Sequence, residues 1–148
     1  MEYDIRKISA SDIHIVKEIW EELNSMHYEK SDSFKQHYAG QTFERRCEKF
    51  TLMPEEDVLI EAAFAGDRPV AYCICSIDRG RGEIDSIYIK PCCRRQSLGS
   101  VLARRGINWM KSRGCSEIRV CVACGNDDAF PFYESLGFCK RFTVFELL

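Results

Sequence analysis

The chain has 148 residues, of which 45% are apolar and 30% charged, so it is long enough for one globular domain with a single core. Its formal net charge of −2 excludes a general nucleic-acid binder, because such proteins carry a strong basic excess. No apolar run approaches the roughly 18 residues of a membrane span, and the N-terminus lacks the apolar core of a signal peptide. We therefore expect a cytoplasmic protein that binds neither nucleic acid nor membrane.

The nine cysteines are an odd number, and in the expected reducing compartment they do not favour a disulfide framework. The close pairs lack the spacing of a zinc ribbon: Cys73-x-Cys75, Cys92-Cys93 and Cys121-x-x-Cys124. Most cysteines are interpreted as small buried hydrophobes. We expect no metal, and a metal or redox site is the alternative that elemental analysis would test.

The first half of the chain predicts one strand and two helices. Residues 3–8 alternate as a strand does, and residues 9–12 resemble a helix-start box. Apolar residues at helical spacing then predict a helix to about Met26. Residues 27–40 are polar and aromatic without a clear period, which predicts a loop or a bent helical connection. A shorter helix is expected over residues 42–50.

The second half alternates strands and helices. Strands are expected over residues 58–64, 70–77, 83–89, 117–122 and 139–147. Helices are expected from Ser97 to Gly114 and from Asn126 to Gly137. Gly106 falls on the apolar face of the first of these helices, which indicates a close approach to the sheet. The order β-α-α-β-β-β-α-β-α-β predicts an α/β fold with helices on both faces of a mixed sheet, in one domain of residues 1–148.

A basic turn precedes the helix that begins at Ser97. It reads Arg94-Arg95-Gln96-Ser97-Leu98-Gly99-Ser100. The first backbone N–H groups of a helix lack partners within the helix, and the helix dipole adds positive charge there. Two arginines add forked donors, so the segment is suited to bind phosphate. Many helix starts carry such residues and bind nothing, so the turn alone indicates only an anion site.

A second unit, residues 126–138, carries Tyr133 on a helix that follows a strand directly. On its own, Tyr133 is more typical of a core residue whose hydroxyl has a hydrogen-bond partner. Together the two units resemble the GNAT superfamily of acetyltransferases. The segment from Ile87 to Ser100 is similar to motif A of that superfamily, and Tyr133-Glu134-Ser135-Leu136-Gly137-Phe138 is similar to the end of motif B. The preceding element order matches as well, so the resemblance covers nearly the whole chain.

The resemblance implies a mixed, mostly antiparallel, twisted sheet of six to seven strands, splayed between strands 4 and 5 and flanked by about four helices. It implies acetyl-CoA as co-substrate. Backbone groups of Ile87 and Ile89, with Tyr88 between them, would pair with the pantetheine arm. The pyrophosphate would meet amides from Arg95 to Ser100 beside Arg94, and Asn126 matches a position that contacts pantetheine or water. Ser97 departs from the usual glycine, at a point where glycine lets the backbone approach the pyrophosphate.

The resemblance also implies a direct attack by an amine. Tyr133 matches the general-acid position and is protonated at neutral pH. Glu83 and Asp85 match acidic positions that accept the amine proton, directly or through water. Both lie on one strand face by period two. Solvated charges at a strand edge are the alternative interpretation of both residues.

The acceptor site is expected around the first helix and the loop after it, where His27 and Tyr28 are candidate substrate-binding residues. A primary amine of a small molecule is the leading acceptor. Acetylation of a protein N-terminus or lysine is the second hypothesis, and a non-catalytic acyl-CoA-binding module is the third, raised by Ser97. The sequence leaves the oligomeric state open, a homodimer included.

Overall fold

Five strands of residues 2–148, the part of the chain that the computed structural model describes, form one twisted sheet in the order β1-β2-β3-β4-β5. The strands are β1 (Asp4–Ile8), β2 (Val58–Ala65), β3 (Arg68–Asp78), β4 (Arg81–Ile89) and β5 (Glu117–Val120). Neighbours from β1 to β4 pair antiparallel, and β5 pairs parallel with β4. A mixed, mostly antiparallel sheet is thereby confirmed.

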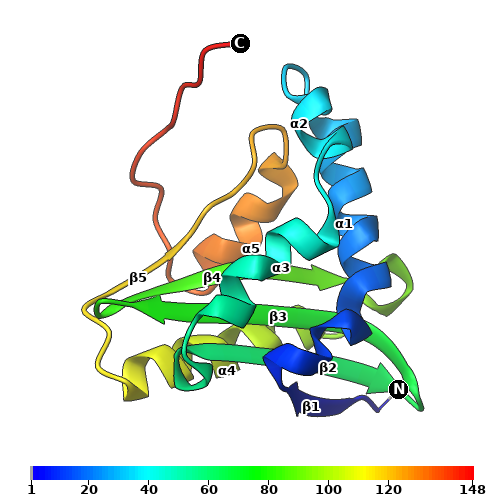
Figure 1. Cartoon of the computed structure of the whole chain (residues 1–148), viewed down its shortest axis with the longest axis vertical. Helices are drawn as coiled ribbons and strands as arrows, with labels where there is room; N and C mark the ends of the chain where they lie inside the picture. Colours follow the sequence, from blue (N-terminus) through cyan, green and yellow to red (C-terminus); the bar gives the residue numbers. More distant parts are fainter. Residues whose placement is uncertain (1) are drawn as a thin grey trace.

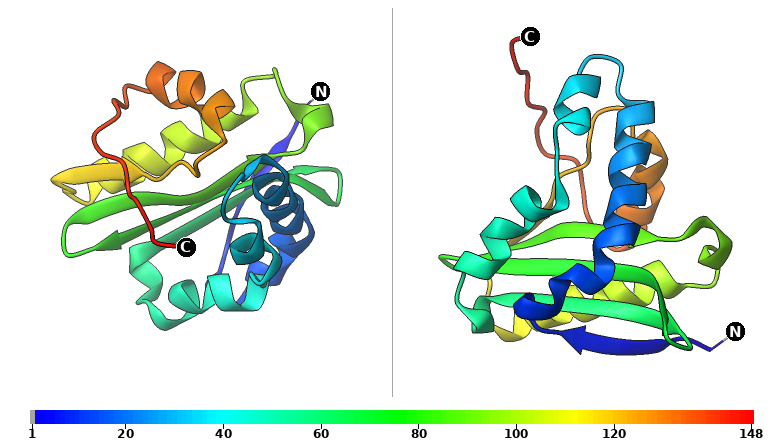
Figure 2. Two further views of the ribbon diagram at one scale, coloured as in Figure 1. Left: turned by 90° about the horizontal axis from the view of Figure 1, so that it is seen from above. Right: turned by 45° about the vertical axis from the view of Figure 1, so that its right-hand side comes forward.

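Helices cover both faces of this sheet (Figures 1 and 2). The helices are α1 (Lys17–Lys30), α2 (Lys35–Ala39), α3 (Phe43–Leu52), α4 (Leu98–Ser112) and α5 (Phe130–Ser135). Apolar residues of α1 and α3 form one core with β2 and β3, and the buried face of α4 forms a second core on the opposite face. The left view of Figure 2 shows the sheet between these two layers, with α5 on the α4 side.

A close approach of α4 to the sheet explains the glycine in the middle of that helix. A Cβ atom built on Gly106 would lie 2.5 Å from Sγ of Cys75 on β3, far closer than real side-chain contacts. Gly106 therefore allows α4 to pack closely on the sheet. This packing offsets the cost of about 1 kcal/mol that glycine carries in helix propensity.

Strand β4 departs from regular pairing in two ways. Opposite β3, Ile74 pairs with Ser86 and Cys75 with Ile84, which leaves Asp85 as the extra residue of a β-bulge. On its other edge, β4 pairs with β5 only from Arg81 to Ile84, so its last five residues face an opening. This is the expected splay between strands 4 and 5.

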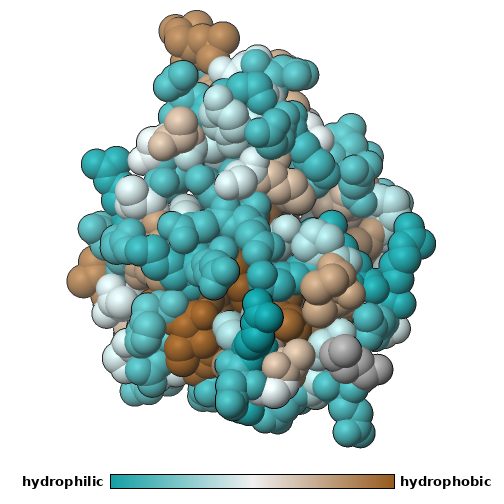
Figure 3. All heavy atoms as spheres, turned by 90° about the vertical axis from the view of Figure 1, so that its right-hand side faces the viewer, coloured by the Kyte–Doolittle hydropathy of each residue, from teal (hydrophilic) through white to brown (hydrophobic). Residues whose placement is uncertain are grey.

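The expected strand at residues 139–147 is wrong, and with it the number of six to seven strands. These residues form no strand. The end of the chain projects from the top of the molecule, where its apolar side chains are exposed (Figures 1 and 3). The alternating sequence favours extension, but a strand also needs a partner edge. Arg141 reaches Glu117 at the start of β5, with Nη1 3.3 Å from Oε1, and the chain then leaves the sheet.

Three other expectations needed adjustment. A 3₁₀ helix, Ala10–Val16, precedes α1, so the chain starts helically at the expected point but with tighter turns. Between residues 27 and 40, α1 continues to Lys30 and α2 follows, which makes this segment the bent helical connection. Four of the nine cysteines are buried, and Cys121 lies exposed beyond the end of β5. None of the helices formed by residues 2–148 is both long and apolar enough to cross a membrane.

Candidate active site

The turn between β4 and α4 forms a basic rim around the N-terminus of α4. Arg94 donates from Nε to the carbonyl oxygen of Ile89 at 2.9 Å, and its guanidinium lies 5.1 Å from the ring centre of Tyr88. Arg95 and Ser97 both adopt left-handed backbone conformations, with φ of 62° and 63°. Two residues of the turn therefore occupy a backbone conformation that favours glycine.

A cavity of about 550 Å³ extends from this turn along the free part of β4. Nearly all the sequence-predicted cofactor residues line it: Ile87, Tyr88, Ile89, Arg94, Arg95, Ser97, Leu98, Gly99, Ser100 and Asn126. Gln96 is the exception, because its side chain accepts a hydrogen bond from the Tyr3 hydroxyl at 3.1 Å. Gly99 keeps the helix start narrow, since a Cβ there would lie 3.0 Å from Cδ1 of Ile89. The cavity joins cationic and amide donors at one end to an unpaired strand edge along its side.

A second cavity, of about 410 Å³, lies on the other side of the same opening. Helices α1, α2 and α3 form one wall, and β4 with the end of β5 forms the other. The two cavities share Leu23, Ile87, Asn126 and Tyr133. They therefore meet where β4 separates from β5, and a group that enters from one cavity can reach a group held in the other.

Tyr133 stands at this junction. It comes from α5, and the rings of Phe132 and Phe138 lie edge-on to it at centroid distances of 5.1 and 6.0 Å. In the part of the chain described here, no side chain or backbone group hydrogen-bonds to its hydroxyl. Burial raises the pKa of Tyr133 to about 12. The hydroxyl is therefore protonated at neutral pH and available to donate a proton.

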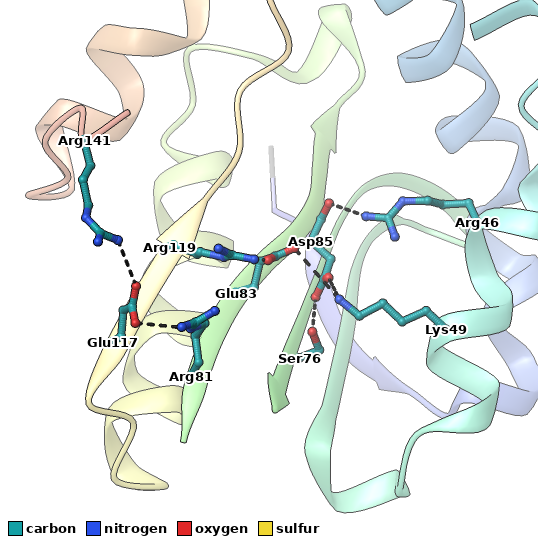
Figure 4. A network of polar contacts seen from close by, with 9 residues as sticks. All are labelled: Arg46, Lys49, Ser76, Arg81, Glu83, Asp85, Glu117, Arg119 and Arg141. Atoms are coloured by element: carbon teal, nitrogen blue, oxygen red, sulfur yellow. Dashed lines mark hydrogen bonds and ion pairs between the residues drawn. The ribbon is translucent and has the colours of Figure 1, made fainter. Parts of the chain in front are cut away.

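Glu83 and Asp85 both line the second cavity, but their surroundings differ (Figure 4). The Asp85 side chain has no exposed surface, accepts a hydrogen bond from Ser76 at 2.6 Å, and pairs with Lys49 at 2.5 Å. Burial raises the pKa of Asp85, and the bonds from Lys49 and Ser76 offset only part of that effect. The bulge points Asp85 and Ser86 to the same face of the sheet, where Ser86 lies 2.6 Å from the Tyr72 hydroxyl.

Glu83 keeps more access to the cavity. Its side chain is 22% exposed and accepts from Nε of Arg119 on β5 at 3.1 Å, with Lys49 4.0 Å away (Figure 4). Of the two carboxylates, Glu83 is the one that a molecule or a water in the cavity can reach.

His27 and Tyr28, the two candidate acceptor residues, point in different directions. His27 lines the second cavity, stacks on Tyr38 at a centroid distance of 5.4 Å, and has a buried Nδ1 without a partner among the described residues. Burial, with a smaller effect of Lys30, lowers the pKa of His27, so the ring is neutral at pH 7. Tyr28 is exposed, lies outside both cavities, and packs against Lys35, whose Nζ is 4.8 Å from the ring centre.

The sequence and the fold have counterparts among known proteins. Residues 16–138 match the sequence model of the acetyltransferase (GNAT) family. The chain belongs to this family. Spermidine N(1)-acetyltransferase of Thermoplasma acidophilum is 26% identical to it over 145 residues, which are 93% of this chain and 89% of that protein. An uncharacterised N-acetyltransferase of Methanocaldococcus jannaschii is 26% identical over 149 residues, which are 96% of this chain, and the chain spans 63% of that relative's length.

A solved structure agrees with the fold. The PaiA N-acetyltransferase of Thermoplasma acidophilum, crystallised with coenzyme A, aligns with a TM-score of 0.75 and 24% identity over 97% of this chain and 94% of that one. Membership makes this chain an acetyltransferase domain of the acetyl-CoA-dependent GNAT kind. The first cavity fits that co-substrate, since it combines a cationic helix start for phosphates with an open strand edge for an amide-containing arm. Among residues 2–148, no group of three or more His, Cys, Asp or Glu side chains is arranged to hold a metal ion.

Several cavity residues have no counterpart in the sequence analysis: Trp20, Asn24, His37, Tyr38, Gln41 and Arg46. They come from α1, α2, α3 and the short connection between α2 and α3, and no motif reports how these segments pack. The aromatic content of residues 27–40 was the one available signal for His37 and Tyr38.

Proposed function

We propose that this chain transfers the acetyl group of acetyl-CoA to a primary amine of a small molecule. The observation that carries the proposal is the junction of the two cavities at Tyr133 and Ile87. One cavity offers donors for phosphates, and the other is a separate, partly enclosed space for the acceptor. Because these walls come from α1 through α5, we also propose that residues 1–148 act as one domain.

In the proposed reaction, the basic turn holds the pyrophosphate and the free edge of β4 orients the pantetheine arm. The amine enters from the second cavity and loses its proton to Glu83 through water, because Asp85 is fully covered by its partners. A backbone N–H on the free edge of β4 donates to the carbonyl oxygen as negative charge develops there. Tyr133, which burial keeps protonated at neutral pH, then gives its proton to the departing sulfur.

A small acceptor is favoured over a protein because α2 covers the second cavity with His37 and Tyr38. These two rings pack edge-on at a centroid distance of 5.0 Å, and Asn24 ties Tyr38 to α1 through a 2.9 Å hydrogen bond to its carbonyl oxygen. Similarity to a spermidine acetyltransferase supports an amine of low molecular weight.

A screen of amines with thiol release as readout tests the proposal, run on the wild type and on Tyr133→Phe. We expect turnover of at least one small amine, with kcat reduced about 10²–10⁴-fold by the substitution. Acetyl-CoA affinity should stay within about twofold, since the phenyl ring is kept. Turnover that the substitution leaves unchanged would remove Tyr133 from the acid role. Measurable acetyl-CoA binding without turnover of any amine would favour a binding module, and turnover of peptides alone would favour a protein acceptor.

A further inference from the structure

The acceptor cavity contains a guanidinium that no carboxylate neutralises. Arg46 lines the cavity from α3, and its Nη2 donates to the backbone carbonyl of Asp85 at 2.9 Å. Its guanidinium carbon lies 5.3 Å from the ring centre of Phe50. Within residues 2–148, no carboxylate lies within ion-pair distance of Arg46. A forked donor is thus held in a partly enclosed space with most of its N–H groups unused.

The carboxylates of the same cavity are already occupied by other cations (Figure 4). Lys49 pairs with Asp85 at 2.5 Å, and Arg119 pairs with Glu83 at 3.1 Å. These two pairs are neutral as a set, and Arg46 adds one positive charge. A polyamine carries only positive charge at neutral pH, so the unbalanced positive charge of Arg46 repels it.

The place of Arg46 fits an anion at the end of the acceptor away from the reaction. Arg46 is fixed at Asp85 on β4, whereas the cavities meet at Ile87, two residues further along the strand. Two residues of a strand span roughly 7 Å. This distance matches the separation between the carboxylate and the terminal amine of an extended lysine.

We infer that Arg46 binds the carboxylate of the acceptor through its guanidinium fork, and that the acceptor is an amino acid with a terminal primary amine. Arginine suits this task because its planar donors match both oxygens of a carboxylate. The inference rests on the proposed function and narrows its acceptor class. The spermidine acetyltransferase relative does not conflict with it, because acceptor specificity depends on a few side chains and the two chains are only 26% identical.

The test compares L-lysine with cadaverine, which is lysine without its carboxylate. For the wild type we expect kcat/KM to be about 10- to 100-fold higher for lysine, the factor that a hydrogen-bonded charge pair supplies. Arg46→Met should lower kcat/KM for lysine by that factor and leave cadaverine unchanged or improved. Arg46→Lys keeps the charge but not the forked donors, so its kcat/KM for lysine should lie between those of the wild type and Arg46→Met. Arg45→Met is the matched control, because Arg45 lies next to Arg46 on α3, is exposed, and lines neither cavity.

Equal kcat/KM for lysine and cadaverine, or a preference that survives Arg46→Met in a folded variant, would overturn the inference while the acetyltransferase function stands. If no amine is turned over, the proposed function fails instead. Calorimetric titration then tests separately whether Arg46 binds a carboxylate. Nε-acetyl-lysine and N-acetylcadaverine are each added to the enzyme–CoA complex. Stronger binding of Nε-acetyl-lysine that disappears in Arg46→Met would support a carboxylate site, and equal binding of both would exclude it.

Discussion

Replacing Ser97 by glycine should stabilise the protein and leave cofactor binding intact. Ser97 has φ of 63° and ψ of 8° and directly precedes α4, where it provides no side-chain cap. This left-handed conformation costs an L-residue about 1–2 kcal/mol and costs glycine almost nothing. The substitution also gives the unfolded chain more conformational freedom, which cancels about 0.4–1 kcal/mol of that gain in stability. The net expectation is a gain of about 0.5–1 kcal/mol in the free energy of unfolding.

Thermal unfolding measures this gain directly. For a domain of this size, 1 kcal/mol shifts Tm by about 2–4 °C, so Ser97→Gly should raise Tm by about 1–4 °C. Ser100→Gly is the matched control, because Ser100 lines the same cavity but lies inside α4, where glycine costs about 0.5 kcal/mol. Calorimetry should find the affinity of Ser97→Gly for acetyl-CoA equal or higher. A Tm lowered as much as in the control would refute the strain argument, and a tenfold loss of affinity would show that the hydroxyl holds phosphate.

Three further changes have defined outcomes. Gly106→Ala should lower the free energy of unfolding in urea by about 0–2 kcal/mol, because crowding against Cys75 exceeds the gain in helix propensity; a clear stabilisation would contradict the close packing. Glu83→Gln should lower kcat/KM more than Asp85→Asn, and the reverse order would assign the base to Asp85. For His27, whose pKa is lowered by burial, the unfolded chain binds more protons below pH 6.5, so stability falls as pH falls. His27→Gln should therefore lose less Tm than the wild type between pH 7 and 5, and identical losses would count against a buried neutral ring.

Much of the fold could be predicted because local pattern and global packing agree. The hairpin strands, the turn at residues 94–100 and the helix after it carry their own signals, and Gly106 indicated the close layer contact correctly. The C-terminal segment shows the limit. Its alternation of apolar and polar residues indicates which side chains a strand would bury. A strand also needs the free edge of a neighbouring strand in the right place, and a local sequence pattern does not report that.

The candidate site likewise contains residues that the sequence predicts and residues that it does not. Residues on the continuous unit from Ile87 to Ser100 were found because one turn places them together. No local pattern predicts Arg46 or Tyr38 as cavity residues, because they reach the cavity only through the packing of α3 on the sheet and of α2 on α1. The pairing of Asp85 with Lys49 was equally hidden, since a period of two treats Glu83 and Asp85 as equivalent.

The bulge at Asp85 and its neighbours accounts for how several of these residues are arranged. Asp85 points toward Ser76 and Lys49, which cover its carboxylate and leave that of Glu83 as the one within reach of the cavity. The Asp85 carbonyl accepts a hydrogen bond from Arg46, which holds the guanidinium at the second cavity. A regular β4 would direct Ser86 to the opposite face and place every later side chain on the other side of the sheet. Ile87 and Ile89 would then face away from α4, and the strand edge would no longer continue the cavity at the start of that helix.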